Sequence, residues 1–96
     1  MRLLAIIERK TREFAEEHFE RLLEPEAECV RTLYSQGIFR SVHSRGDVKG
    51  AVVELECESI GDAQSALAQL PFASAGLVSI QLIPLLPYRG FAPRNL

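Results

Sequence analysis

Residues 37–55, GIFRSVHSRGDVKGAVVEL, constrain the fold most, because they predict a β-hairpin with two different faces. The segment RGDVKG at 45–50 is a turn signal between two strand-like runs. Pairing the strands about this turn places cross-strand partners on one face. The mixed face then holds three pairs, His43 with Val52, Ser41 with Glu54 and Phe39 with Glu56. The apolar face consists of Ile38, Val42, Val53 and Leu55.

Two helical stretches are expected before the hairpin, and a strand before them. Residues 2–8, RLLAIIE, form a short apolar run typical of a central strand. Apolar side chains then recur at helical spacing from 14 to 34. We expect Thr11 to cap the first helix, Pro25 to start a second one, and Gly37 to end it in a left-handed conformation.

A helix and a strand are also expected after the hairpin. Residues 59–62, SIGD, match a helix-start motif, and Pro71 ends the helix that follows. Residues 72–76 are predicted to be a flexible loop. Residues 77–85 alternate as a last strand, with Val78 on one face and Gln81 on the other, and Pro84 restricts this strand to a sheet edge.

The predicted order β-α-β-β-α-β is that of a ferredoxin-like α+β fold, a four-stranded antiparallel sheet with both helices on one face. A chain of 96 residues forms a single domain, 1–96, and its tail, 87–96, is expected to be extended, either frayed or wrapped on a partner. Two helices leave the other face of the sheet open. An apolar patch of that size usually meets a partner, and we expect a second copy of the chain.

Composition and charge argue against several classes of partner. The chain is 47% hydrophobic and 25% charged with a net charge of −2, so nucleic acid and anionic membranes are disfavoured. No apolar run approaches the roughly 20 residues that span a bilayer, and we expect a cytoplasmic protein. Cys29 and Cys57 belong to no metal or redox motif, so neither a metal site nor a cofactor is predicted.

The strand order alone would also suit RNA binding, because the RNA recognition motif shares it. That module stacks bases on aromatic side chains of its third strand. Here the strand opens with Lys49-Gly50, but Ala51, Val53 and Leu55 stand at the aromatic positions. The carboxylates of Glu54 and Glu56 would also face the phosphates, which disfavours RNA.

Four short motifs are similar to those of one enzyme family. They are GIFRSV at 37–42, LECES at 55–59, LPF at 70–72 and IQLIPL at 80–85. Together they resemble the motifs of muconolactone Δ-isomerase and its relatives in the dimeric α/β-barrel superfamily. The resemblance implies a homodimer whose two sheets face each other, further assembly, and a cofactor-free isomerase that acts on a lactone or another enolisable, carboxylated small molecule.

Most polar positions of that family are changed in this chain. Its histidine of the second strand falls at Ser41, its Trp-Arg pair at His43-Ser44, its asparagine of the third strand at Ala51, and its histidine of the second helix at Gln64. Only Arg40 is retained. The resemblance therefore supports the fold more strongly than the reaction.

The residues themselves suggest a site on the mixed face. In a partly dry cavity between two sheets, Glu54 would act as a base and His43 as its acid partner or as a substrate-orienting group. Alternatively, both side chains are simply solvated or ion-paired. Arg40 either binds a substrate carboxylate or pairs with a helix glutamate on the helix side. Phe39, Ser41 and Gln81 complete the predicted substrate-binding set, and the hydroxyl of Tyr34 either reaches the pocket or its ring packs in the core.

The second hypothesis belongs to another functional class. The same dimeric barrel can serve as a non-catalytic ligand-binding or assembly domain. A small-molecule ligand is expected under both hypotheses where a cavity exists.

Overall fold

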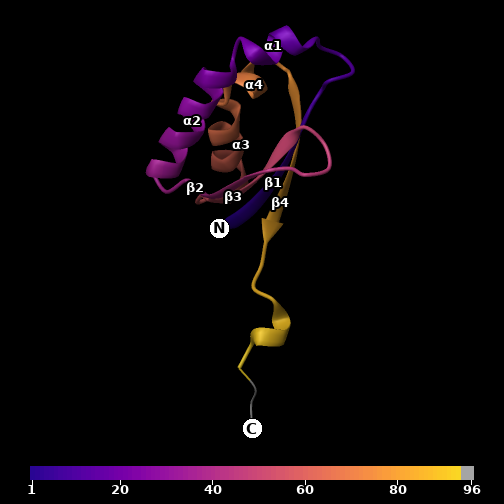
Figure 1. The fold of residues 1–96 in the computed structure, drawn as a ribbon. Coiled ribbons are helices and arrows are strands. Elements are labelled where there is room, and N and C mark those ends of the chain that lie inside the picture. Colours follow the sequence, from indigo (N-terminus) through magenta and orange to yellow (C-terminus); the bar gives the residue numbers. More distant parts are fainter. Residues whose placement is uncertain (94–96) are drawn as a thin grey trace.

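The computed structural model describes residues 1–93, and its elements follow the predicted order (Figure 1). The strands are β1 (Arg2–Arg9), β2 (Phe39–Ser44), β3 (Gly50–Glu56) and β4 (Val78–Leu85). The helices are α1 (Glu16–Glu20), α2 (Leu23–Ser35), α3 (Ile60–Ala68) and α4 (Pro71–Ser74), and a 3₁₀ turn, η1 (Arg89–Phe91), follows β4.

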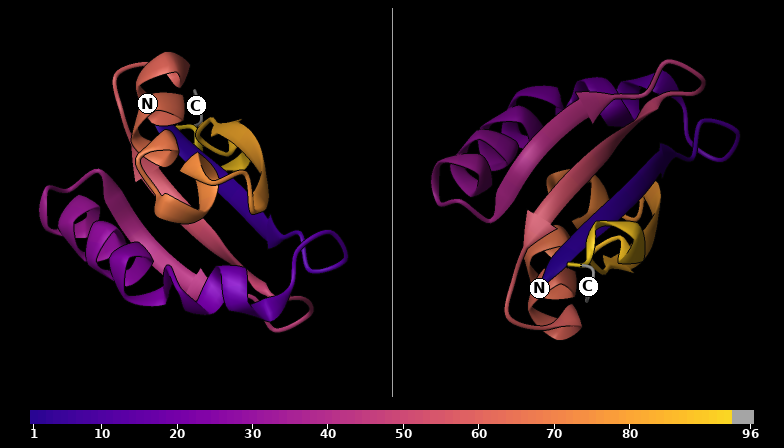
Figure 2. Two further views of the ribbon diagram at one scale, coloured as in Figure 1. Left: turned by 90° about the horizontal axis from the view of Figure 1, so that it is seen from above. Right: turned by 90° about the horizontal axis from the view of Figure 1, so that it is seen from below.

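The four strands form one antiparallel sheet in the order β2-β3-β1-β4, and the helices cover one of its faces (Figure 2). This is a ferredoxin-like α+β fold, as predicted. The opposite face, which we call the open sheet face, has no helix over it (Figure 2). Pro84 lies in the edge strand β4, opposite Leu3, where a residue without an N–H is tolerated.

The core lies between the sheet and the helices. In β1, Leu3, Ala5 and Ile7 are buried toward the helices, because successive side chains of a strand point to opposite faces. The main cluster also contains Leu33, Phe39, Val53, Leu55, Ala63, Ala66, Leu67 and Leu70. A second, smaller cluster of Phe19, Phe72 and Leu77 joins α1 to α4.

Gly37 ends α2 as predicted. Its φ of 78° is left-handed, a conformation that only glycine adopts at little cost. Its N–H donates to the Tyr34 carbonyl, and the Ile38 N–H donates to the Leu33 carbonyl, both at 3.0 Å. These two bonds satisfy the last carbonyls of the helix and turn the chain directly into β2.

Two predictions about local structure are wrong. Thr11 caps no helix: residues 11–14 form a turn, because the Lys10 N–H still pairs with the Leu77 carbonyl at 2.8 Å and α1 starts only after Ala15. Residues 72–76 are not a flexible loop. Pro71 starts the short helix α4, and the Phe72 ring packs edge-on against Phe19 with centroids 5.6 Å apart.

The register of the hairpin is partly as predicted. Ser41 faces Glu54 and His43 faces Val52, but Phe39 faces Leu55 and is 1% exposed. The predicted place of Phe39 on the mixed face is therefore wrong. An irregularity between Phe39 and Ser41 inserts Arg40 as an extra residue, and this β-bulge moves the Phe39 side chain to the other face.

The tail leaves the sheet on the side opposite to the helices (Figure 1). Residues 86–93 continue from β4 and include η1, and the predicted tail of 87–96 ends in residues 94–96, which lie outside the described part of the chain.

Candidate functional site

A cavity of about 140 Å³ lies on the helix side of the sheet, between α2, α4 and the strands. Arg9 at the end of β1, Glu26 in the first turn of α2 and Ser44 at the end of β2 contribute its polar side chains. The rest of the lining is apolar or glycine, namely Ile7, Val30, Phe39, Val42, Gly50, Ala51, Val53, Leu70, Phe72 and Val78. An apolar cavity with few polar groups is the usual form of a small-molecule site.

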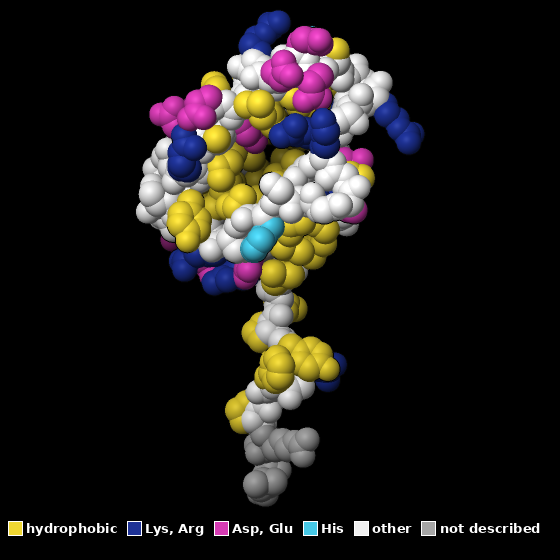
Figure 3. All heavy atoms as spheres, viewed as in Figure 1, with side chains coloured by type: hydrophobic (Ala, Val, Ile, Leu, Met, Phe, Trp, Pro, Cys, Tyr) yellow, Lys and Arg dark blue, Asp and Glu magenta, His cyan; other side chains and the backbone are white. Residues whose placement is uncertain are grey.

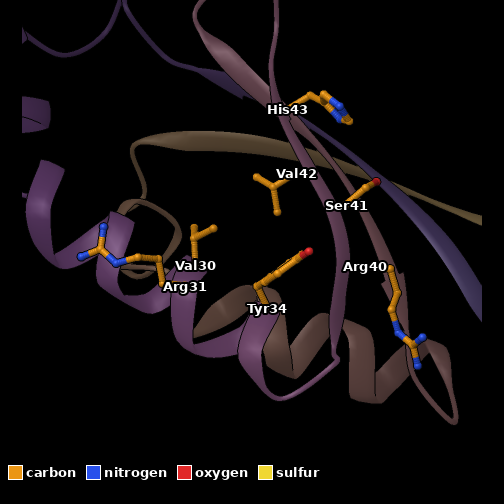
Figure 4. A pocket seen from close by; sticks show the side chains of 7 residues that line it. All are labelled: Val30, Arg31, Tyr34, Arg40, Ser41, Val42 and His43. Carbon is orange, nitrogen blue, oxygen red and sulfur yellow. The ribbon is translucent and has the colours of Figure 1, made fainter.

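A wider hollow of about 450 Å³ lies outside this cavity, between α2 and the edge strand β2. Val30 and Val42 line both, so the hollow meets the cavity between these two side chains. Figure 4 shows Val30 and Val42 pointing toward one another, and the Tyr34 ring leaning toward β2. In Figure 3 the recess beside α2 is lined by hydrophobic side chains. Tyr34 is 59% exposed, so it borders the hollow and does not pack in the core.

Arg9 brings a positive charge to the cavity. Its guanidinium lies over the rings of Phe72 and Phe19, at 5.0 and 5.5 Å from their centroids. Such stacking holds a guanidinium without using its N–H donors. Among residues 1–93 no carboxylate forms an ion pair with Arg9. Its donors can therefore bind an anionic group of a ligand.

Glu26 brings a carboxyl group to the same cavity. Its Oε1 accepts a hydrogen bond of 2.9 Å from the Phe72 N–H, which ties α2 to the start of α4. Burial raises the pKa of Glu26 above its ordinary value, although the Phe72 N–H and the charge of Arg9 act in the opposite direction. A carboxyl group with a raised pKa in a cavity is suited to accept and return a proton.

The size of the cavity limits the ligand. An apolar cavity of roughly 150 Å³ holds one benzene molecule in a well-studied lysozyme variant. The inner cavity thus has room for about one six-membered ring, and larger substituents would extend into the outer hollow. The arrangement can bind a single-ring anion at Arg9 and exchange a proton with it at Glu26.

The predicted pair of Glu54 and His43 lies elsewhere, on the open sheet face. Arg2 Nη1 donates to Glu54 Oε1 at 2.5 Å, and Ser41 Oγ donates to Glu54 Oε2 at 3.5 Å. The same Arg2 also pairs with Glu56, at 3.3 Å. His43 is exposed and leaves β2 on the opposite side from Val42 (Figure 4). The structure brings Ser41 and Glu54 together, and Ser41 and His43 also border the outer hollow, as does Arg40. Glu54 lines neither the hollow nor the inner cavity.

The other predicted binding residues are divided between the two faces. Phe39 lines the cavity on the helix side, while Gln81 is exposed on β4 and shares the open sheet face with Ile6. Arg40 is exposed at the bulge, where its Nε donates to the Gly37 carbonyl at 2.7 Å. Its predicted ion pair with a helix glutamate is absent from residues 1–93. The binding and catalytic roles of these residues stay predictions.

Sequence reasoning missed Arg9 and Glu26. Glu26 belongs to a glutamate-rich stretch, residues 13–28, whose interspersed charges are typical of a solvated helix face. One signal could have identified it: Glu26, Val30 and Leu33 stand at i, i+4 and i+7, so Glu26 lies on the apolar face of α2. Arg9 had no comparable signal, because its partners Phe19 and Phe72 are distant in sequence.

Residues 1–93 contain neither a cluster of three potential metal ligands nor a helix suited to cross a membrane. No group of three His, Cys, Asp or Glu side chains in this part is arranged to hold a metal ion. None of its helices is both long and apolar enough to cross a membrane.

The comparisons with known proteins identify a structural neighbour but no relative by sequence. No protein-family model matches the chain, and no curated protein matches it either. A solved structure that it resembles is 5-chloro-2-hydroxyhydroquinone dehydrochlorinase from Burkholderia phenoliruptrix AC1100, in complex with 2,5-dihydroxybenzoquinone. The TM-score is 0.71 at 14% sequence identity, and the match covers 94% of this chain and 98% of the other. At this identity the likeness establishes the shared fold.

Proposed function

We propose that this protein is a cofactor-free enzyme that moves a proton on a small, single-ring anionic substrate, in the manner of a muconolactone isomerase. The observation that carries the proposal is that Arg9 and Glu26 line one largely apolar cavity of ring size. The structural neighbour, a dehydrochlorinase of a single-ring compound, supports a substrate of this size. The proposal includes a homodimer formed through the open sheet face.

The proposed step uses only side chains of the cavity. The Glu26 carboxylate takes a proton from a carbon next to the substrate carbonyl, and the electron pair of the broken C–H bond moves onto the carbonyl oxygen. The Arg9 guanidinium stabilises the enolate or the substrate carboxylate. Glu26, now a carboxylic acid, returns the proton to the same or a conjugated carbon, so that the enzyme ends as it began. Substrate bound against Val30 and Val42 would exclude water from the enolate.

The experiment is proton exchange in D₂O with muconolactone as the probe, followed by loss of its C–H signals in ¹H NMR. Glu26→Gln keeps an acceptor for the Phe72 N–H but cannot take a proton. General acid–base catalysis contributes about 10²- to 10⁴-fold, so the exchange rate should fall by at least 10²-fold. Exchange of muconolactone at the buffer rate with the unaltered protein would contradict the proposal, as would full activity of Glu26→Gln.

Glu54→Gln is the matched control and tests the competing site. One observation favours that site, since Glu54 accepts from Ser41 on the face that also carries His43. If Glu54 is the base in a cavity between two sheets, Glu54→Gln loses the exchange and Glu26→Gln retains it. We expect the reverse, because Glu54 is held by Arg2 and lies outside the cavity.

A non-catalytic ligand-binding or assembly domain is the second candidate function. The hydrogen bond from Phe72 to Glu26 favours it, because this bond gives the carboxylate a structural role between two helices. In that case muconolactone would still bind, and its binding would still depend on Arg9. Its C–H protons would exchange no faster than in buffer.

A further inference from the structure

The cavity and the outer hollow run between helix α2 and strand β2, and both elements line them in matching layers. On α2, Glu26 and Val30 line the cavity, and Val30 and Tyr34 line the hollow. These residues are four apart, so each one lies about 6 Å further along the helix axis. On β2, Ser44 and Val42 line the cavity, and Val42 also lines the hollow. Polar side chains thus lie at one end, and the two valines follow toward the hollow.

Arg9 belongs to the polar end of the cavity. Together with Ser44 and Gly50, it also lines a separate hollow beside the hairpin turn. Within residues 1–93, that hollow shares no lining residue with the outer hollow, which the cavity meets between Val30 and Val42. A ligand whose anionic group binds Arg9 therefore directs the opposite side of its ring toward the two valines.

The two arginines at the outer hollow direct their charges away from it. Figure 4 shows the guanidinium groups of Arg31 and Arg40 pointing away from the Tyr34 ring. Each has a partner of its own. Arg31 Nη2 donates to Glu24 Oε1 at 2.6 Å, and Arg40 Nε donates to the Gly37 carbonyl at 2.7 Å. Neither charge therefore faces the space between α2 and β2.

The other polar residues of the outer hollow belong to the opposite face of β2. The Ser41 hydroxyl donates to Glu54, and His43 leaves the strand on the opposite side from Val42 (Figure 4). The side chains that do face the space between α2 and β2 are the two valines and the Tyr34 ring (Figure 4). The outer hollow thus offers an apolar surface directly beyond the cavity.

We propose that the substrate is a ring acid with an apolar substituent opposite its anionic group, and that Val30, Val42 and Tyr34 determine which substituent is accepted. This inference names the substrate class of the proposed function and rests on it. The anionic group binds Arg9 and the ring fills the cavity of about 140 Å³. The substituent passes between the valines and lies against the Tyr34 ring, where its removal from water favours binding.

The first test measures dissociation constants of benzoate and its 4-methyl, 4-ethyl and 4-propyl derivatives by ¹H–¹⁵N NMR titration of the full chain. Each added carbon should lower the dissociation constant about fourfold, which is about 0.8 kcal/mol per buried methylene. 2-Propylbenzoate is the matched control, because it has the same apolar group beside the carboxylate, and it should bind about tenfold or more weakly than 4-propylbenzoate. Equal binding of these two isomers, or a constant that does not fall along the series, would overturn the proposal.

The second test changes the wall that the substituent contacts. Tyr34 is 59% exposed, so its replacement leaves the core intact. Tyr34→Ala should weaken 4-propylbenzoate about fivefold or more and leave benzoate within about twofold, because only the longer ligand reaches the ring. Tyr34→Phe, the matched control, keeps the ring and should bind both ligands like the unaltered protein. Equal weakening of 4-propylbenzoate by both variants would mean that the hydroxyl matters rather than the ring, and would contradict an apolar contact.

The outcomes separate this proposal from the proposed function, because these titrations report binding and proton exchange reports the reaction. Benzoate binding that depends on Arg9 but gains nothing from a 4-alkyl group would overturn the apolar substituent alone. Tighter binding along the series, without proton exchange of muconolactone, would support the substituent and overturn the reaction. Failure of all the benzoates to bind at millimolar concentration would overturn the substrate class proposed here.

Discussion

Glu26 has two roles at the level of a single side chain. Through Oε1 it accepts the Phe72 N–H and joins two helices, and it also supplies a carboxyl group to the cavity. The first role can be kept by any acceptor of the same shape, whereas the second needs a group that titrates. Glutamine meets the first condition and not the second, which makes Glu26→Gln a selective change.

The pH dependence of stability tests the environment of Glu26 without a substrate. Burial raises its pKa in the folded state, so its contribution to stability is complete below the unfolded pKa of about 4.3 and is lost as pH rises through the folded pKa. Urea unfolding should therefore give a higher unfolding free energy for Glu26→Gln, relative to the unaltered protein, at pH 7 than at pH 4. A difference that is equal at both pH values, or that shifts the other way, would contradict a raised pKa.

At the level of elements, the bulge in β2 determines which side chains belong to the core. Because Arg40 is an extra residue, Phe39 joins Leu55 on the helix side while Ser41 and His43 keep the open sheet face. Phe39 thus forms part of the cavity wall, and its ring helps to position the strand against α2.

Phe39→Ala tests this register directly. A fully buried phenylalanine that is cut to alanine costs about 3–5 kcal/mol of unfolding free energy. Ser41→Ala, two residues away on the open sheet face, should stay within about 0.5 kcal/mol in the same urea titration. A loss below about 1 kcal/mol for Phe39→Ala would instead place its ring on the surface, as the unbulged hairpin predicts.

The elements were largely predictable from sequence, whereas the site was not. Alternation in the strands, Gly37 at the end of α2 and the start motif at Ser59 are local signals, and the structure confirms them. The bulge at Arg40 has no such signal, and one inserted residue was enough to misplace Phe39. The cavity depends on Arg9 meeting Phe19 and Phe72, which are contacts between distant parts of the chain.

At the level of the whole molecule, the two faces of the sheet have separate roles. The helix side holds the cavity with Arg9 and Glu26, and the open sheet face is proposed as the surface for a second copy. Dimer formation and ligand binding should therefore respond to different substitutions. The Arg2–Glu54 pair belongs to the second surface, and as a partly exposed ion pair it contributes little to stability.

The location of a bound ligand is the most direct test of this account. The probe is 2,5-dihydroxybenzoquinone, and the measurement is its effect on ¹H–¹⁵N NMR spectra of the full chain. We predict shifts centred on Val30, Val42, Val53 and Phe72, which are lost in Arg9→Met. Shifts confined to Ser41, His43, Val52 and Gln81, and retained in Arg9→Met, would place the ligand on the open sheet face and contradict the central claim.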